Sequence, residues 1–176
     1  MNFYYQHRVR PLGAMLMGLL LAIALHSCSR FTIQEYEATA LTSYTWRVEY
    51  FISHNEKLPR VEKFASSSLL NINGEKPERA AREADEKGLW WPSLPPRPSL
   101  DEIEQRQKPS ERHSRPELLR TVKYHLSYTR DGREVRLPTN YSVYRRAVKA
   151  HAKGQSLKLT LGINNGWVEK AEPLNF

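Results

Sequence analysis

The sequence predicts an α+β fold, with an antiparallel sheet of five or six strands, one amphipathic helix packed on it and a helical, proline-rich insertion. Three observations support this prediction. Several segments alternate apolar and polar residues, one segment has helical periodicity, and prolines gather in a highly charged stretch between them. Residues 28–176 are long enough for one domain with a hydrophobic core, and residues 74–117 form the insertion.

Two segments in the first half of the domain have strand character. Residues 44–52 alternate aromatic and branched residues with polar ones, which is typical of a half-buried β-strand. Residues 68–72 predict a second, short strand that ends at Asn73-Gly74.

The second half predicts two β-hairpins. Asn, Asp and Gly tolerate the positive φ angles of tight turns, and they stand here between alternating segments. The first hairpin joins residues 122–128 to residues 135–137 through Asp131-Gly132. The second joins residues 157–163 to residues 167–171 through Asn164-Asn165-Gly166.

The segment from Tyr141 to Lys153 predicts an amphipathic helix that ends at Gly154. Its basic side chains fall within one arc of about 100° around the helix axis, and apolar residues fill the remainder. This basic arc consists of Arg145, Arg146, Lys149 and Lys153. Residues 121–176 carry ten basic and four acidic side chains, so the arc is a candidate contact with an anionic surface. A solvated helix face is the alternative.

The insertion has a different composition. Pro77 to Lys87 predicts a charged helix that ends at Gly88. A proline-rich stretch follows, which favours extended backbone. Ser99 and Ser114 each stand three residues before a glutamate, the spacing of a capping box, so we expect a short helix to begin at each serine.

Two adjacent tryptophans, Trp90 and Trp91, stand at the start of the proline-rich stretch. Exposed aromatic side chains on rigid backbone lose little entropy when a partner binds them. Large aromatic side chains are also usually buried, so the pair could instead fasten the insertion to the sheet. Both alternatives remain open from the sequence.

The sequence contains no recognisable catalytic or metal-binding motif. No pair of the six histidines has the spacing of a metal site, and there is no phosphate loop, dinucleotide fingerprint or nucleophile elbow. His125 alternates with tyrosines on a predicted strand and should face solvent. We therefore expect no metal, no cofactor and no enzymatic activity, while an enzyme with scattered catalytic residues remains a third alternative.

The N-terminus has the organisation of a secretory signal. Arg8 and Arg10 precede an apolar run over residues 12–25, and the chain's one cysteine, Cys28, follows directly. The run is shorter than the ~20 residues that a membrane-spanning helix needs. Leu25-His26-Ser27-Cys28 resembles the lipobox of bacterial lipoprotein precursors. The resemblance implies that residues 1–27 are a signal peptide, and that Cys28 is lipidated and becomes the new N-terminus.

Two other fates of this segment are open. Ala22-Ile23-Ala24 offers a site for ordinary signal peptidase, or the run is retained as an anchor. The lipoprotein reading places the protein on a membrane of the cell envelope or an internal membrane, on its periplasmic, lumenal or outer face. We expect a membrane-anchored binding or scaffold domain that contacts a partner protein or an anionic surface and no nucleic acid. The alternative is a small-molecule or peptide binder with a pocket between sheet and insertion.

Overall fold

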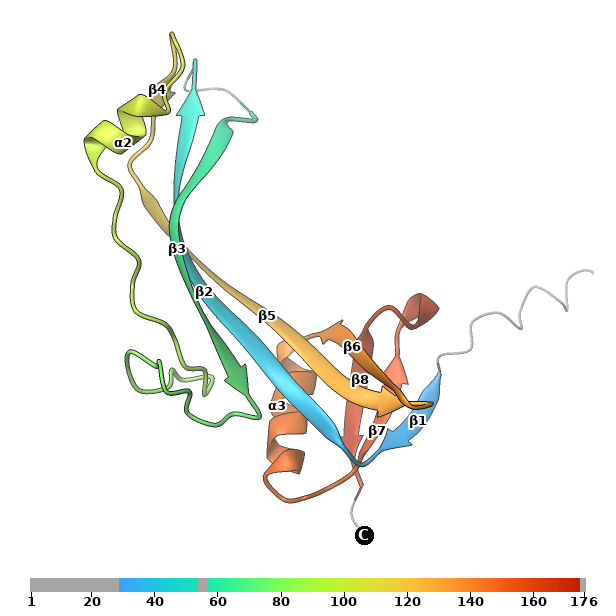
Figure 1. The fold of residues 1–176 in the computed structure, drawn as a ribbon. Coiled ribbons are helices and arrows are strands. Elements are labelled where there is room, and N and C mark those ends of the chain that lie inside the picture. The colour runs from blue at the N-terminus through green and yellow to red at the C-terminus, as the bar shows by residue number, and fades with distance from the viewer. Residues whose placement is uncertain (1–28, 54–56, 175–176) are drawn as a thin grey trace, which may run out of the picture.

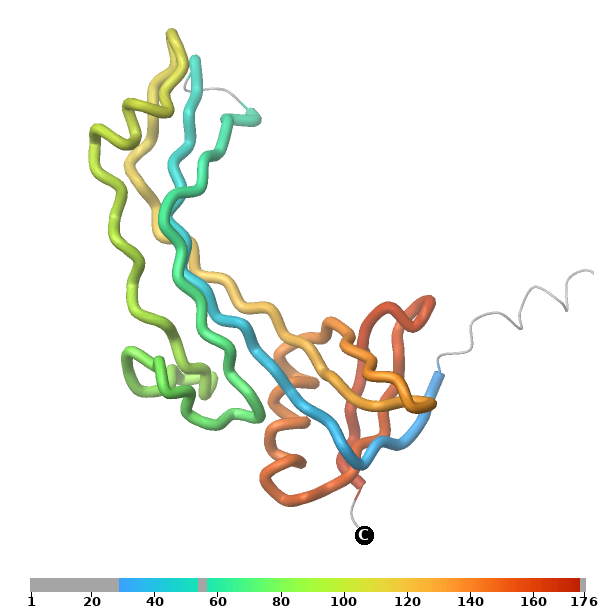
Figure 2. The backbone as a smooth tube through the Cα atoms, in the orientation of Figure 1, coloured from blue at the N-terminus to red at the C-terminus, as the bar shows by residue number. Residues whose placement is uncertain are grey.

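The computed structural model describes residues 29–53 and 57–174, which form a base and a long arm (Figures 1 and 2). The base contains one helix, four short strands and the inner halves of two long strands: β1 (Arg30–Ile33), β6 (Arg133–Thr139), α3 (Tyr141–His151), β7 (Leu157–Leu161), β8 (Val168–Pro173), residues 36–42 of β2 (Tyr36–Phe51) and residues 124–130 of β5 (Glu117–Arg130). The arm contains the outer halves of β2 and β5, together with α2 (Leu100–Gln105), β4 (Arg112–His113) and most of β3 (Arg60–Ile72), whose last residues pair with the inner half of β2.

The strands form two antiparallel sheets, and the fold is mainly β. One sheet has the order β1-β7-β8, and the other has the order β3-β2-β5-β6 with β4 paired to the end of β2. The prediction of a single sheet is therefore wrong, because the strands form two separate sheets. The β7–β8 hairpin pairs with β1, with Phe31 opposite Leu159, and does not extend the sheet at β6. The short 3-10 helix η2 (Ile163–Asn165) lies in the turn of this hairpin.

The main core lies in the base, where α3 and the small sheet pack on one face of the large sheet. We call this the inner face; it carries the even-numbered side chains of β2. Ala38 and Ala40 are completely buried there, and their small side chains allow α3 to approach closely. Leu159 of β7 and Ala147 of α3 complete the same core without exposure to solvent.

The predicted hairpins and the amphipathic helix are confirmed. Asp131 and Gly132 have φ angles of 52° and 71° in the β5–β6 turn, and β7 pairs with β8 around the expected Asn-Asn-Gly turn. Helix α3 begins after Asn140, whose side chain accepts the Val143 backbone N–H. It ends at His151, slightly before the predicted end, and Gly154 then takes a φ of 64°.

Two predictions for the insertion are wrong. Residues 77–87 form turns and not a helix, because their backbone donors bond to the segment that follows: Ala81 N–H donates to Trp91 O, and Asp85 N–H to Leu89 O. No helix begins at Ser114 either, because its N–H donates to Glu49 O and its hydroxyl accepts the Glu49 N–H, which ties it to β2.

Other local predictions for this half of the chain are confirmed. Ser99, itself in extended conformation, caps α2 with a reciprocal capping box to Glu102, and residues 89–99 form neither helix nor strand. Asn73 and Gly74 end β3 with positive φ angles. The strand before them is longer than predicted and begins at Arg60.

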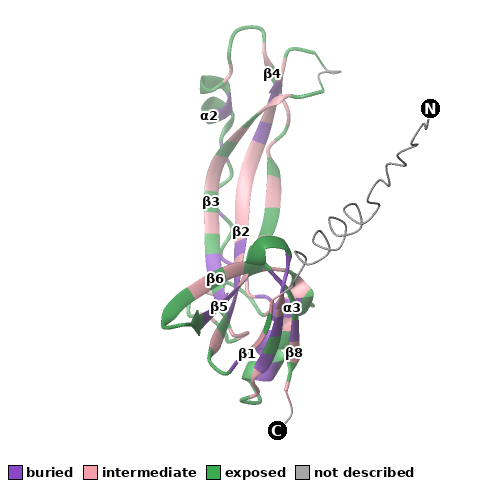
Figure 3. Ribbon diagram, turned by 90° about the vertical axis from the view of Figure 1, so that its right-hand side faces the viewer, coloured by how far each residue is buried: buried purple, intermediate pink, exposed green. Residues whose placement is uncertain are grey.

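The insertion covers the inner face along the arm and leaves the opposite, outer face open. Val48 and Tyr50 of β2 form a second small core with Ile103 of α2. Figure 3 views the arm from the side opposite α2. Leu70 and Ile72 of β3 lie on this outer face, each 39% exposed.

Candidate functional site

Trp91 lies buried between the insertion and the sheet. Its ring is 5.0 Å from the ring of Tyr44 in β2, and its indole N–H donates to Asp85 Oδ2 at 2.9 Å. The guanidinium of Arg120 in β5 lies 4.4 Å from the same ring and 5.8 Å from the ring of Tyr44. These contacts hold the insertion against the sheet from within the chain.

Trp90 is held through its backbone. Its N–H donates to Asn71 Oδ1 at 2.7 Å, and its carbonyl accepts the Thr42 hydroxyl at 2.8 Å and the Asn71 amide at 3.1 Å. Asn71 and Thr42 are completely buried, so this network satisfies polar groups that would otherwise be costly. The Trp90 side chain is only half-buried, with the Lys76 ammonium 5.2 Å from its ring.

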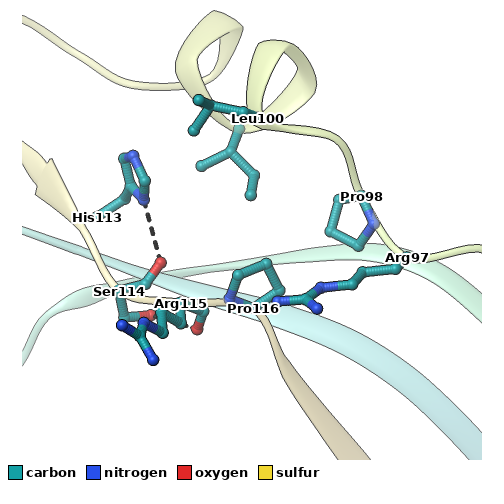
Figure 4. A pocket seen from close by; sticks show the side chains of 8 residues that line it. Arg97, Pro98, Leu100, His113, Ser114, Arg115 and Pro116 are labelled. Atoms are coloured by element: carbon teal, nitrogen blue, oxygen red, sulfur yellow. Dashed lines mark hydrogen bonds between the residues drawn. The ribbon is translucent and has the colours of Figure 1, made fainter.

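A hollow of about 360 Å³ lies further along the arm, between the start of α2 and the segment that joins β4 to β5 (Figure 4). Prolines and aliphatic side chains form much of its lining: Pro98, Leu100, Ile103 and Pro116. His113, Ser114 and two arginines, Arg97 and Arg115, contribute the polar groups. No carboxylate is among the lining residues.

Arg97 and Arg115 each precede a proline, which favours extended backbone at the arginine. Arg97 crosses the hollow toward Pro116 in Figure 4, and its guanidinium lies 5.7 Å from the ring of Trp46. Trp46 is itself fixed by a hydrogen bond from its indole N–H to Pro95 O. Neither arginine forms an ion pair with any residue that the structure describes.

Other arginines near the end of the arm form ion pairs. Arg60 binds Glu111 at 2.7 Å and Glu62 at 2.5 Å, and its guanidinium lies 4.3 Å from the ring of Tyr50. The hydrogen bond from Arg60, with the Lys108 N–H, lowers the pKa of Glu111 to about 2. This cluster joins β3 to the loop between α2 and β4.

The four residues of the predicted basic arc are not equally exposed in the structure. Arg146 and Lys149 on α3 and Lys153 beyond it are exposed. Arg145 is half-buried, and its guanidinium lies beside Gly88, so that a Cβ built on Gly88 would be 3.5 Å from Arg145 Nη1. Three of the four cations are therefore available at the surface of the base, while Arg145 faces the insertion.

His125 differs from its predicted environment. It lies on the outer face, but it is half-buried beside Thr39, its cross-strand partner. Burial is the main cause that lowers its pKa, and Arg136 and Lys123 act in the same direction. Among the described residues, neither the buried Nδ1 of His125 nor the buried hydroxyl of Thr39 has a hydrogen-bond partner. Within residues 29–53 and 57–174, no three His, Cys, Asp or Glu side chains gather as metal ligands.

Cys28 and the signal segment lie outside the described residues. Of the helices within the described ranges, none is long and apolar enough to cross a bilayer. The first described residue, Ser29, is tied to the base, because its carbonyl accepts the Leu161 N–H of β7.

The sequence interpretation missed the hollow. Its two arginines are eighteen positions apart in the chain and belong to no motif, although each stands in an Arg-Pro pair that fixes the local backbone. Only the path of the insertion along β2 brings them to one hollow. No family model, curated protein or solved structure matches the chain.

Proposed function

We propose that this protein is a membrane-anchored lipoprotein whose arm binds a partner protein, and that it acts by binding and not by catalysis. The observation that carries the proposal is the shape of the large sheet. β2 runs from Tyr36 in the base to Phe51 at the end of the arm. At about 3.3 Å per residue its sixteen residues reach ~50 Å.

The arm extends away from the part of the base that contains Ser29, the residue that follows the proposed lipidation site. Cys28 directly precedes Ser29, which is fixed to β7 of the base. Two acyl chains on Cys28 would give stable anchoring, since each buried CH₂ contributes about 0.8 kcal/mol. The end of the arm lies away from β1 in Figure 1. A protein held by Cys28 therefore presents its arm to partners away from the lipid surface.

The surface of the arm supports binding to a protein. Leu58, at the end of the arm, is 88% exposed, and Leu100 beside the hollow is 58% exposed. Leu100 lines the hollow together with Arg97 and Arg115, and arginine is enriched where proteins contact one another. Leu100 begins α2, which is capped by Ser99 and packs on β2 through Ile103, so little entropy is lost when a partner contacts this side chain.

Photo-cross-linking in native membranes tests this proposal. A photoreactive amino acid is placed at Leu58 or Leu100 in the arm, and at Ile163 in the base as a control of similar exposure, 80%. We expect discrete protein adducts from the two arm positions and none from Ile163. Absence of arm adducts, or the same adducts from all three positions, would contradict a role of the arm.

The anchor is tested separately by metabolic labelling with a radioactive fatty acid. The wild type should carry the label, and Cys28→Ala should lose it and accumulate as a larger precursor. An unmodified thiol at Cys28 in mass spectra of the mature wild type would contradict lipidation.

A further inference from the structure

We propose that the hollow between α2 and the β4–β5 segment binds a short peptide segment of a partner protein in which an aliphatic residue is flanked by carboxylates. This inference rests on the proposed function and names the chemistry of the partner at one position on the arm. The hollow combines an apolar lining with two cations and lies beside the exposed side chain of Leu100.

The charges of the hollow are complementary to an acidic ligand. Arg97 and Arg115 line it without a carboxylate among the other lining residues, and neither is in an ion pair within the described chain. On the same arm Arg47, Arg60 and Arg106 pair with glutamates, whereas Arg112 and Arg120 form no ion pair with a described residue. The two arginines at the hollow are thus free to form charge-assisted hydrogen bonds, which a guanidinium makes in a planar, two-pronged geometry with carboxylates.

The apolar lining of the hollow favours a ligand that has an aliphatic side chain next to its carboxylates. Ile103, which is only 2% exposed, lines the hollow together with Pro98, Leu100 and Pro116. The volume of about 360 Å³ is near the lower limit of ~300–1,000 Å³ that is usual for ligand sites, so it suits a few side chains and not a large cofactor.

The walls of the hollow are rigid before any ligand arrives. Pro98 and Pro116 restrict the backbone next to each arginine, and the Ser99–Glu102 capping box fixes the start of α2. The Tyr50 hydroxyl donates to Ile103 O at 2.8 Å and holds α2 on β2. A preformed site of this kind favours a short extended segment over a long flexible polyanion, which would gain from charge alone and not from the apolar lining.

Fluorescence anisotropy with the purified full chain in detergent tests the inference. The probe is a short dye-labelled peptide with one leucine flanked on both sides by glutamates, and the matched control peptide has glutamine at each glutamate. We expect saturable binding of the glutamate peptide alone. Arg97→Gln with Arg115→Gln should weaken this binding by about tenfold or more, because two charge-assisted contacts are lost.

Two further variants separate the contribution of the apolar lining from the effect of total charge. Leu100→Ser should also weaken binding of the glutamate peptide. It should leave the fold intact, because Leu100 is already 58% exposed. Arg133→Gln with Arg136→Gln removes the same charge from exposed positions of β6 in the base and should leave binding unchanged.

Several outcomes would overturn the inference. Equal binding of the glutamate and glutamine peptides, or unchanged affinity in the Arg97/Arg115 variant, would show that the arginines do not select carboxylates. Competition by inorganic polyphosphate together with insensitivity to Leu100→Ser would show a general anion site. If the cross-links from the arm persist while the peptide fails to bind, this inference fails alone. If the peptide binds but the arm captures no partner in native membranes, the proposed function fails instead.

Discussion

Two buried tyrosines show how one hydroxyl group either supports the fold or opposes it. The Tyr50 hydroxyl donates to the carbonyl of Ile103 and joins β2 to α2. The Tyr144 hydroxyl in α3 is buried and has no hydrogen-bond partner in the part of the chain that the structure describes, and burial raises the pKa of Tyr144 to about 12. A buried polar group that lacks a hydrogen bond reduces the free energy of unfolding, whereas a satisfied one is neutral or favourable.

Exchange of each tyrosine for phenylalanine should therefore have opposite results. Tyr50→Phe should lower the free energy of unfolding by about 1 kcal/mol, because one buried hydrogen bond is lost. Tyr144→Phe should leave it unchanged or raise it, because an unsatisfied hydroxyl is removed from the core. Urea unfolding of both variants under the same conditions measures the difference. A larger loss for Tyr144→Phe than for Tyr50→Phe would show that the Tyr144 hydroxyl has a partner in solution.

Trp91 is a buried contact between the insertion and the sheet, with its ring against Tyr44 of β2 and Arg120 of β5. Trp91→Ala should lower the free energy of unfolding by about 3 kcal/mol, because a large aromatic side chain leaves a cavity. It should also make residues 74–99 sensitive to protease. Trp90→Ala is the matched comparison and should cost less, because the hydrogen bonds of Trp90 to Asn71 and Thr42 come from its backbone. Thermal melts and limited proteolysis measure both. An unchanged melt in Trp91→Ala together with loss of a cross-linked partner would instead show that Trp91 contacts the partner.

The ion pair between Arg60 and Glu111 makes the end of the arm sensitive to acid. The folded-state pKa of Glu111, about 2, is below the usual value of 4.5, so the pair stabilises the fold fully above pH 4.5. This stabilisation should decrease as the pH falls toward 2. Glu111→Gln should accordingly lower the melting temperature at pH 6 and match the wild type near pH 2.

Calorimetry from pH 6 to pH 2 measures this effect. Glu104→Gln, at an exposed carboxylate of α2 without an ion pair in the described chain, is the control and should have a small effect throughout. A difference between wild type and Glu111→Gln that persists unchanged to pH 2 would contradict the role assigned to the ion pair.

At the scale of the whole molecule, the exposed cations of the helix lie on the base, which is also where the proposed anchor begins. Each lysine or arginine near an anionic bilayer contributes about 1 kcal/mol of attraction. Arg146→Glu, Lys149→Glu and Lys153→Glu together should therefore weaken the binding of the unlipidated domain to anionic vesicles. Arg145 is left unchanged because its guanidinium lies beside Gly88 of the insertion.

Vesicle flotation measures this binding. The same number of charge reversals on the arm, at Lys57, Lys63 and Lys108, is the control and should have less effect. Added salt should weaken wild-type binding, since the Debye length falls from about 10 Å at 0.1 M to about 3 Å at 1 M salt. Equal binding to neutral and anionic vesicles would rule out an electrostatic contact.

The elements that the sequence determined are those whose signals are local. The turns at Asp131-Gly132 and Asn164-Asn165-Gly166, the positive φ of Gly154 after α3 and the capping box at Ser99 each involve residues within a few positions of one another. Backbone dihedral preferences and nearby hydrogen bonds fix such features before any long-range packing forms.

Tertiary structure decided the features that depend on distant partners. Residues 77–87 have the composition of a helix but no apolar stripe, so bonds to residues 89–91 replaced the bonds within a helix. The β7–β8 hairpin pairs with β1 in a second sheet, and its apolar face shares a core with α3, which no residue near the hairpin turn specifies. The hollow with Arg97 and Arg115 exists only because the insertion follows β2 along the arm. The energy of such contacts depends on which surfaces meet, and that information is not present in any local stretch of sequence.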